Sequence, residues 1–295
     1  MTSTRDDPTL RDLVEPVVAE LIDRAPAAAG HLMLVGALCR DVLHREAGQS
    51  FALRRTSDLD LALAVDSRER FEDVGRLLPR AQSSAQVRYE LAGVKVDLIP
   101  FGGVESPAGA VPLTPGIEPL DVFAFGDVWD AARVIRLSGG LELRIPTVPG
   151  YTVLKLGAWA TRSRYGEFKD GGDLACAMYW YQNSPAVHDR LYEDDRGHHI
   201  LGHAWAHDPP LDAHTLMLAD DAVGLLTTPN RIELINRWAQ VEDDLLTTYL
   251  DNGNLEGWPT RGSSILAGHV RSLREGLHLP TPPPEPGEVE GVQES

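Results

Sequence analysis

Two aspartates, Asp58 and Asp60, stand at the head of a strictly alternating segment, DLDLALAV. Such alternation predicts a β-strand, in which residues i and i+2 project from one face roughly 6.5–7 Å apart. Carboxylates that share a site raise each other's pKa unless a cation lies between them. Mg²⁺ suits this position, because it prefers oxygen ligands and completes its shell with water and substrate phosphates. The pair is a candidate metal site, and a solvated strand edge is the alternative.

A third carboxylate, Asp97, interrupts the apolar segment VKVDLIPF, where a strand with one buried face would carry Val, Ile or Leu. If this strand lies beside the one with Asp58 and Asp60, the cluster could hold two metal ions about 3.5–4 Å apart. That arrangement activates an attacking oxygen and stabilises a leaving one. The alternative is that Asp97 faces solvent or pairs with Lys95 on the same face.

A phosphate site is predicted at Gly36 and Ala37, where the apolar run HLMLVG passes into the expected helix ALCRDVLHREAG. Glycine lets a phosphate approach the backbone, and the N–H groups of a helix N-terminus favour an anion. A triphosphate could dock there. Glycine is also common at such turns for steric reasons, so the turn gains meaning only beside the acidic residues.

The elements that must position these residues indicate an α+β fold. Residues 9–25 are expected to form a covering helix with Pro16 as a kink and one apolar face, made of Leu10, Leu13, Val17, Val18 and Leu21. A mixed sheet follows, with a hairpin around Gly93, a loop at 102–120 and a last strand at 141–148. Helical segments dominate after Gly150. We therefore expect a sheet domain at 1–149, a helical domain at 150–278 and a disordered acidic tail at 279–295.

Composition bounds the class of protein. In 295 residues, 43% are apolar, which is enough for a sizeable core, and the net charge of −17 restricts nucleic-acid binding to places where positive charge is local. Cys39 and Cys176 cannot form a disulfide framework, and Cys39 is expected to fill core. The first residues lack a secretion-signal pattern, and no apolar run approaches the roughly 20 residues that span a bilayer. We expect a cytoplasmic protein without a membrane partner.

Together, the Gly36 turn, the Asp58 and Asp60 strand and the later Asp97 resemble the nucleotidyltransferase superfamily, over about the first half of the chain. The resemblance implies a nucleotidyltransferase core at 1–149. A later stretch, VPGYTVLKLGAWATRSRYGEFKDGGDLACAM, is similar to the helical segment of the AbiEii and MenT-type toxin nucleotidyltransferases, in which a Lys and a Lys-Asp-x-x-Asp-Leu run recur.

This resemblance implies transfer of a nucleoside monophosphate from an NTP to an RNA, with tRNA as the expected acceptor. The enzyme would be a toxin that a partner antitoxin restrains. Two Mg²⁺ ions would be held by Asp58, Asp60 and Asp97, and Asp97 would also help to deprotonate the attacking hydroxyl. Lys155 would act as a catalytic residue that faces the phosphates. The implied nucleotide-binding residues are Gly36, Ala37, Arg55, Thr56, Lys155, Lys169 and Asp173.

The chain departs from the family pattern at Ala37, where a Ser or Gly is usual, so only backbone groups could contact a phosphate there. The opening VGALCRDVLHREAG also resembles CCA-adding enzymes, but no arginine-rich template motif follows. Two other functions stay open. One is nucleotidyl transfer to a small molecule such as an aminoglycoside, which an acidic surface would attract. The other is a binding module that keeps the fold without catalysis.

Further residues allow a structural and a functional interpretation. Lys155 and Arg162, seven positions apart on a helix, could form a positive stripe, or Lys155 could be a surface lysine. Asp170 and Asp173 have the spacing of a helix N-cap and its third residue.

Four-residue spacing also places His199, His203 and His207 on one helical face, where Zn²⁺ is conceivable and packing or solvent exposure is the alternative. The aromatic run at 179–181 could stack on a base or pack in the core.

Overall fold

The computed structural model describes residues 7–56, 58–82, 86–113 and 117–280. Of the expected acidic tail, Leu279 and Pro280 are described, Leu279 is buried, and residues 281–295 lie outside the described part.

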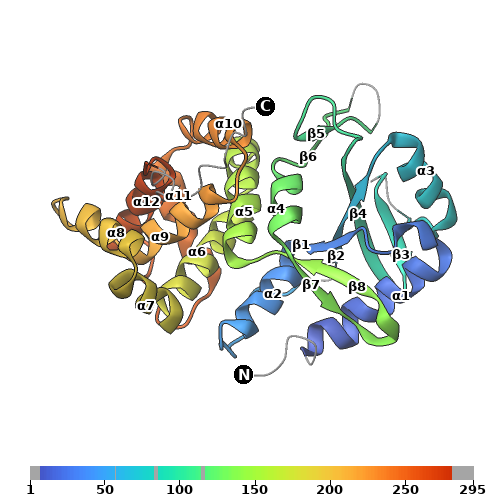
Figure 1. The fold of residues 1–295 in the computed structure, drawn as a ribbon, viewed down its shortest axis with the longest axis horizontal. Helices are drawn as coiled ribbons and strands as arrows, with labels where there is room; N and C mark the ends of the chain where they lie inside the picture. The colour runs from blue at the N-terminus through green and yellow to red at the C-terminus, as the bar shows by residue number, and fades with distance from the viewer. Residues whose placement is uncertain (1–6, 57, 83–85, 114–116, 281–295) are drawn as a thin grey trace, which may run out of the picture.

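Six strands of the described chain form one mixed sheet, in the order β3-β4-β2-β1-β8-β7 (Figure 1). Strand β2 runs parallel to β4 and antiparallel to β1, β1 runs parallel to β8, and β3–β4 and β7–β8 are antiparallel pairs. A mixed α+β architecture is therefore confirmed. The strands are β1 (Leu32–Val35), β2 (Asp58–Val65), β3 (Arg88–Leu91), β4 (Val94–Gly102), β7 (Arg133–Arg136) and β8 (Glu142–Ile145).

The N-terminal covering helix contains an irregular turn. A π-helical turn at Leu10–Val14 leads into α1 (Glu15–Arg24), with Pro16 in the first turn of α1. The expected apolar face is confirmed at Leu10, Val17, Val18 and Leu21, which are buried. It is wrong at Leu13, which is 44% exposed, and Val14 is buried in its place. A π-helical turn is wider than an α-helical one, so residue 14 rather than residue 13 follows residue 10 on the buried side.

Three helical elements flank the strands of the first half. A short 3₁₀ turn (Pro26–Ala28) precedes β1, α2 (Gly36–Glu46) follows β1 directly, and α3 (Arg68–Leu77) follows β2. Ser67 caps α3 by accepting a hydrogen bond from the Arg70 N–H, which satisfies one of the free donors at the start of that helix.

The segment expected to be a loop at 102–120 contains more structure than its Gly and Pro content indicates. Strands β5 (Ala110–Val111) and β6 (Leu120–Asp121) form a small two-stranded sheet, with residues 114–116 outside the described part. Helix α4 (Phe125–Ala131) follows and, like β7, was not expected from the sequence. The 3₁₀ turn at Ser138–Gly140 joins β7 to β8.

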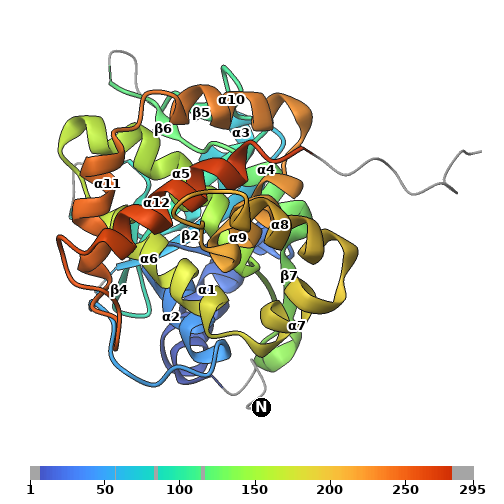
Figure 2. The same ribbon diagram turned by 90° about the vertical axis from the view of Figure 1, so that its left-hand side faces the viewer.

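Helices make up the described chain after β8 (Figures 1 and 2). Helix α12 packs against α9 and α11, and Figure 2 shows it running across this half of the molecule. The helices and 3₁₀ turns are α5 (Val148–Arg162), η5 (Ser163–Tyr165), α6 (Lys169–Gln182), α7 (Pro185–Glu193), α8 (Asp195–Trp205), α9 (Ala213–Gly224), α10 (Thr228–Trp238), α11 (Asp243–Tyr249), η6 (Leu250–Gly253) and α12 (Ser264–Leu277).

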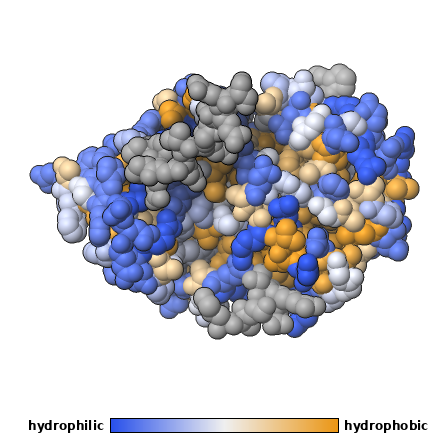
Figure 3. Space-filling view, in the orientation of Figure 1, coloured by the Kyte–Doolittle hydropathy of each residue, from blue (hydrophilic) through white to orange (hydrophobic). Residues whose placement is uncertain are grey.

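The strand-rich and helical parts share one continuous apolar core, although the change from strand to helix falls between Ile145 and Val148. In Figure 3, hydrophilic residues predominate over the α7 and α8 end of the face shown, and hydrophobic residues gather over the sheet. None of the described helices combines the length and apolar character that a membrane crossing requires.

Candidate active site

The two strands that carry the acidic residues are direct neighbours. In the parallel pair β2–β4, Asp60 lies opposite Asp97 and Asp58 lies opposite Lys95. Because residues two apart on a strand share a face, and opposite residues on adjacent strands do too, the three carboxylates project from the same side of the sheet. The fold therefore brings Asp97 next to Asp58 and Asp60, although Asp58 and Asp97 are 39 positions apart in the sequence.

Asp97 takes Arg88 as its partner, in place of the Lys95 considered from the sequence. Arg88 lies opposite Asp97 on the antiparallel strand β3, and its Nε and Nη2 donate to Oδ1 and Oδ2 of Asp97 at 2.7 and 2.6 Å. The same Nη2 lies 3.5 Å from Oδ2 of Asp58. Lys95 is exposed. Arg88 therefore supplies the positive charge between two members of the acidic cluster.

The glycine turn packs directly against Asp60. Val35, the last residue of β1, lies opposite Asp60, and Gly36 follows it with a φ of +68°. A Cβ at Gly36 would lie 1.9 Å from Oδ2 of Asp60, which is far inside contact distance. Only glycine fits this close approach and this left-handed backbone.

Helix α2 begins at this turn, so its N-terminus lies beside the acidic cluster. No side chain of the described residues caps it, and its first turn holds no acidic residue. The first N–H groups of a helix have no partner within the helix and favour an anion. A phosphate could therefore bind next to Asp60, with Ala37 contributing its backbone only.

The pKa of Asp60 is affected by the Asp97 carboxylate and by basic residues of the helical half. Burial and the nearby Asp97 raise the pKa of Asp60 to about 6, and Lys155, Lys169 and Arg162 partly offset that rise. The three basic residues come from α5 and the start of α6, so these helices bring positive charge to the edge of the acidic cluster.

Lys155 is buried and forms two ion pairs. Its Nζ lies 2.9 Å from Oδ1 of Asp170 and 2.7 Å from Oδ2 of Asp173. Burial alone would lower the pKa of Lys155, but Asp173 and Asp170 together raise it above the ordinary value. The interpretation of Lys155 as a surface lysine is therefore wrong, and its ammonium group meets two carboxylates.

Asp170 and Asp173 are not helix caps. Helix α6 begins at Lys169 with Phe168 in the N-cap position, so both aspartates lie within the helix, where they are buried. Arg162 lies on the other side of Asp170, with its Nη1 3.5 Å from Oδ2. The expected positive stripe of Lys155 and Arg162 is therefore partly neutralised by an acidic pair.

Arg40, which the sequence analysis did not single out, completes this buried network. Its Nη1 donates to Oδ1 of Asp173 at 3.1 Å, and its Nη2 donates to the Arg54 carbonyl oxygen at 2.6 Å and to Oδ1 of Asp41 at 2.7 Å. Although burial raises the pKa of Asp173, Lys155 and Arg40 together lower it below its usual range. Arg40 thus ties α2 to α6 and to the segment before β2.

The remaining expected nucleotide-binding residues are Arg55, Thr56 and Lys169. Arg55 and Lys169 are exposed, and the Thr56 hydroxyl hydrogen-bonds the backbone carbonyl oxygen of Asp58 at 3.3 Å. Between α5 and α6, Arg164 and Tyr165 are exposed, Tyr165 to 69%. Exposed basic and aromatic side chains thus lie between α5 and α6 and at the start of α6, although the overall charge is acidic.

Two other expectations concern residues away from the cluster. Trp180 is buried and donates through Nε1 to Nδ1 of His44 at 3.0 Å, and the Tyr181 hydroxyl donates to Asp221 at 2.7 Å, so both belong to the core rather than to a base-stacking surface. Cys39 is buried, as expected.

Neither a comparison with protein-family models nor one with curated proteins finds a match for this chain. The site itself combines three carboxylates on one sheet face, a helix N-terminus beside them and basic residues at their edge. This combination is chemically suited to a polyphosphate bound together with a divalent cation.

Proposed function

We propose that this chain is a metal-dependent nucleotidyltransferase that moves a nucleoside monophosphate from an NTP to an RNA, with tRNA as the expected acceptor. The observation that carries the proposal is the placement of Asp60, which lies opposite Asp97 on the neighbouring strand and against the Gly36 turn. Asp60 is thus part of a carboxylate pair beside the N-terminus of α2, the helix end to which we assign the phosphates.

The donor set fits Mg²⁺. Asp58, Asp60 and Asp97 offer only oxygen ligands, and the raised pKa of Asp60 reflects burial beside a like charge. Arg88 now neutralises part of this charge, which a divalent cation would do more fully. The three aspartates would hold two Mg²⁺ ions. When bound, Mg²⁺ would neutralise the phosphates and make the acceptor hydroxyl easier to deprotonate.

The chain's own residues would position the nucleotide. Backbone N–H groups of Gly36 and Ala37 would donate to the phosphates, since Ala37 has no hydroxyl to offer. Lys169 and Arg162 would face the phosphates, because the Nζ of Lys155 is already held by two carboxylates. Lys155 then acts as a positioning residue that fixes α5 against α6.

In the reaction, the acceptor hydroxyl oxygen would attack the α-phosphorus. The new P–O bond forms as the bond between the α-phosphorus and the bridging oxygen breaks, and pyrophosphate leaves. Arg88 must turn away from Asp97, after which the Asp97 carboxylate can accept the hydroxyl proton. Arg88 is partly exposed, with 27% of its side chain accessible, so this movement requires no opening of the core.

Exposed basic and aromatic side chains around the start of α6 favour RNA over a small cationic acceptor. Arg164 and Tyr165 lie between α5 and α6, Lys169 is the first residue of α6, and all three are exposed. Arginine and lysine bind the phosphate backbone, and an exposed aromatic ring can stack on an unpaired base. We propose that this segment receives the end of the RNA and that the enzyme is the toxin of a toxin–antitoxin pair.

A transfer assay tests the proposal. Protein, Mg²⁺ and each NTP labelled on its α-phosphate are incubated with total tRNA or with aminoglycosides. We expect label in tRNA, its loss in Asp60→Asn, and its retention in Asp66→Asn, an exposed aspartate at the end of the same strand.

The outcomes separate the alternatives. Label in an aminoglycoside alone would overturn the RNA acceptor but keep the reaction class. No label in either, with folded protein and Mg²⁺ present, would overturn catalysis and favour a binding module. Growth arrest by wild type but not by Asp60→Asn would support the toxin assignment, and equal arrest by both would contradict it.

A further inference from the structure

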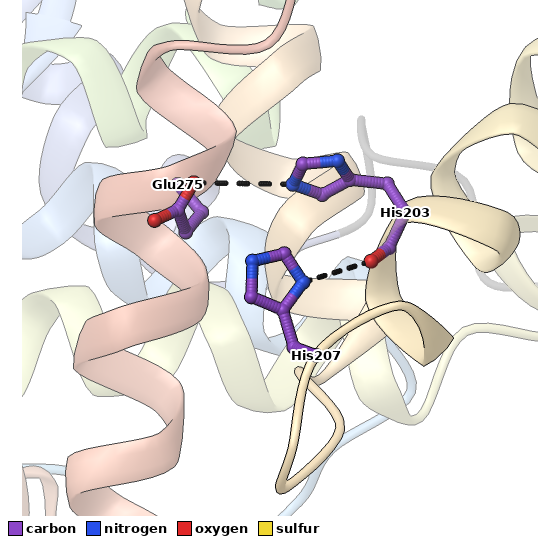
Figure 4. Close-up of side chains that lie close together, drawn as sticks. All are labelled: His203, His207 and Glu275. Atoms are coloured by element: carbon purple, nitrogen blue, oxygen red, sulfur yellow. Dashed lines mark hydrogen bonds and ion pairs between the residues drawn. The ribbon is translucent and has the colours of Figure 1, made fainter.

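The helical half holds a second group of side chains of types that can bind a metal, made of two histidines and a glutamate rather than aspartates. His203 lies in the last turn of α8, His207 follows that helix, and Glu275 lies on α12 (Figure 4). One ligand atom from each residue lies within 4.8 Å of the other two. His199, which the sequence pattern grouped with the two histidines, is exposed and is not part of this group.

Both imidazoles are arranged to present a free nitrogen. The Nε2 of His203 is shielded from solvent, has no hydrogen-bond partner among the described residues, and lies 3.9 Å from Oε2 of Glu275. The Nδ1 of His207 lies 2.9 Å from the carbonyl oxygen of His203. A carbonyl can only accept, so Nδ1 carries the proton and Nε2 keeps its lone pair. Such a hydrogen bond is the usual way in which a metal-binding histidine is oriented.

We propose that His203, His207 and Glu275 bind one Zn²⁺ ion. Two imidazoles and one carboxylate are a common zinc set that leaves a fourth position for water, whereas Mg²⁺ prefers oxygen ligands alone. Zinc–ligand bonds of about 2.0–2.2 Å put the ligands of one tetrahedral ion roughly 3.3 Å apart. The three ligand atoms lie within 4.8 Å of one another, and the Nε2 of His203 lies 3.9 Å from Oε2 of Glu275, so the ligand atoms must approach one another by up to about 1.5 Å.

The side chains have room to close around the ion. His203 is 31% and Glu275 43% exposed, so small changes of rotamer can bring their ligand atoms together. The bound ion would join the end of α8 to α12, two helices that both pack against α9. Zinc should therefore raise the thermal stability of the chain, because it binds the folded state and holds two distant segments together.

Calorimetric titration with ZnCl₂ tests the site in tag-free protein that carries Asp60→Asn, which weakens competition from the acidic cluster. We expect saturable binding of one Zn²⁺ per chain. His203→Ala and His207→Ala should each weaken it at least about tenfold, since losing a ligand costs no less than losing its outer-shell partner. Glu275→Gln should weaken it in the same direction, and His199→Ala should leave it unchanged.

A second readout keeps folding defects apart from lost ligands. Each variant is melted without metal and with Zn²⁺, and only the zinc-dependent rise in melting temperature should disappear in His203→Ala and His207→Ala. Zinc binding that survives in the double variant, or no saturable binding by the parent, would overturn the proposal. The zinc titration does not involve nucleotide, so its result is independent of the transfer assay.

Discussion

Gly36→Ala tests the contact on which the active site is built. The added Cβ would lie 1.9 Å from Oδ2, 2.7 Å from Cγ and 2.9 Å from Cβ of Asp60, on a backbone with a φ of +68°. The left-handed conformation costs a non-glycine residue about 1–2 kcal/mol, and overpacking costs about 1–3 kcal/mol more. We therefore expect a loss of roughly 2–5 kcal/mol in the free energy of unfolding. Nucleotidyl transfer should be lost as well, because Asp60 must move.

Gly48→Ala is the matched control. Gly48 has a φ of +77° just after the same helix, but a Cβ there would meet nothing within 4 Å. Gly48→Ala should lower the free energy of unfolding only by the cost of the left-handed backbone, about 1–2 kcal/mol. Urea unfolding monitored by circular dichroism measures both values. In an Asp60→Gly background, which removes the obstructing side chain, Gly36→Ala should cost no more than Gly48→Ala. An equal loss for the two alanine variants in the parent chain would refute the proposed packing of the turn against Asp60.

Three further predictions follow from the same structure. Lys155→Met leaves Asp170 and Asp173 without the ammonium group that they share, and should lower the free energy of unfolding by roughly 3–5 kcal/mol. Lys95→Met, at an exposed position, should change it by no more than about 0.5 kcal/mol in the same urea experiment, and similar losses for both variants would contradict the buried network. Arg88→Met removes a partly exposed ion pair with Asp97 that contributes about 0.5–1 kcal/mol, so calorimetry should show Mg²⁺ binding about two- to fivefold tighter. Weaker Mg²⁺ binding would argue against competition between Arg88 and Mg²⁺ for Asp97. Burial, assisted by Arg40 and Arg45 and opposed by the hydrogen bond to Phe51, lowers the pKa of His44 from 6.5 to about 4. Because the unfolded chain takes up the proton first, the free energy of unfolding should fall by up to roughly 3 kcal/mol as the pH falls from 6.5 to 4. A His44→Gln variant whose stability keeps the same pH dependence would refute this.

The acidic residues and their strands could be predicted because their signals are local. Alternation marked β2, and a lone carboxylate in an apolar strand marked Asp97. The partner of Asp97 was also within reach of the sequence. A tight hairpin around Gly93 pairs Leu91 with Val94, and counting back along both strands brings Arg88 opposite Asp97.

The buried network depended on long-range packing that no local pattern contains. Asp173 meets Arg40 across 133 positions, so the spacing of Asp170 and Asp173 suggested a helix cap instead. Lys155 looked like a surface or phosphate-facing lysine for the same reason, since its two carboxylate partners reach it only when α5 packs on α6. Leu13 was misplaced because a π-helical turn breaks the regular period of the helix.

A crystal structure with Mg²⁺ and an NTP analogue that cannot be cleaved at its α-phosphate would show whether the three aspartates hold the cation beside the nucleotide. We expect density for the cation between the carboxylates of Asp58, Asp60 and Asp97, the triphosphate at the N-terminus of α2, and Arg88 turned away from Asp97. A cation bound elsewhere, or an Arg88–Asp97 pair that persists with the nucleotide in place, would contradict the proposed active site.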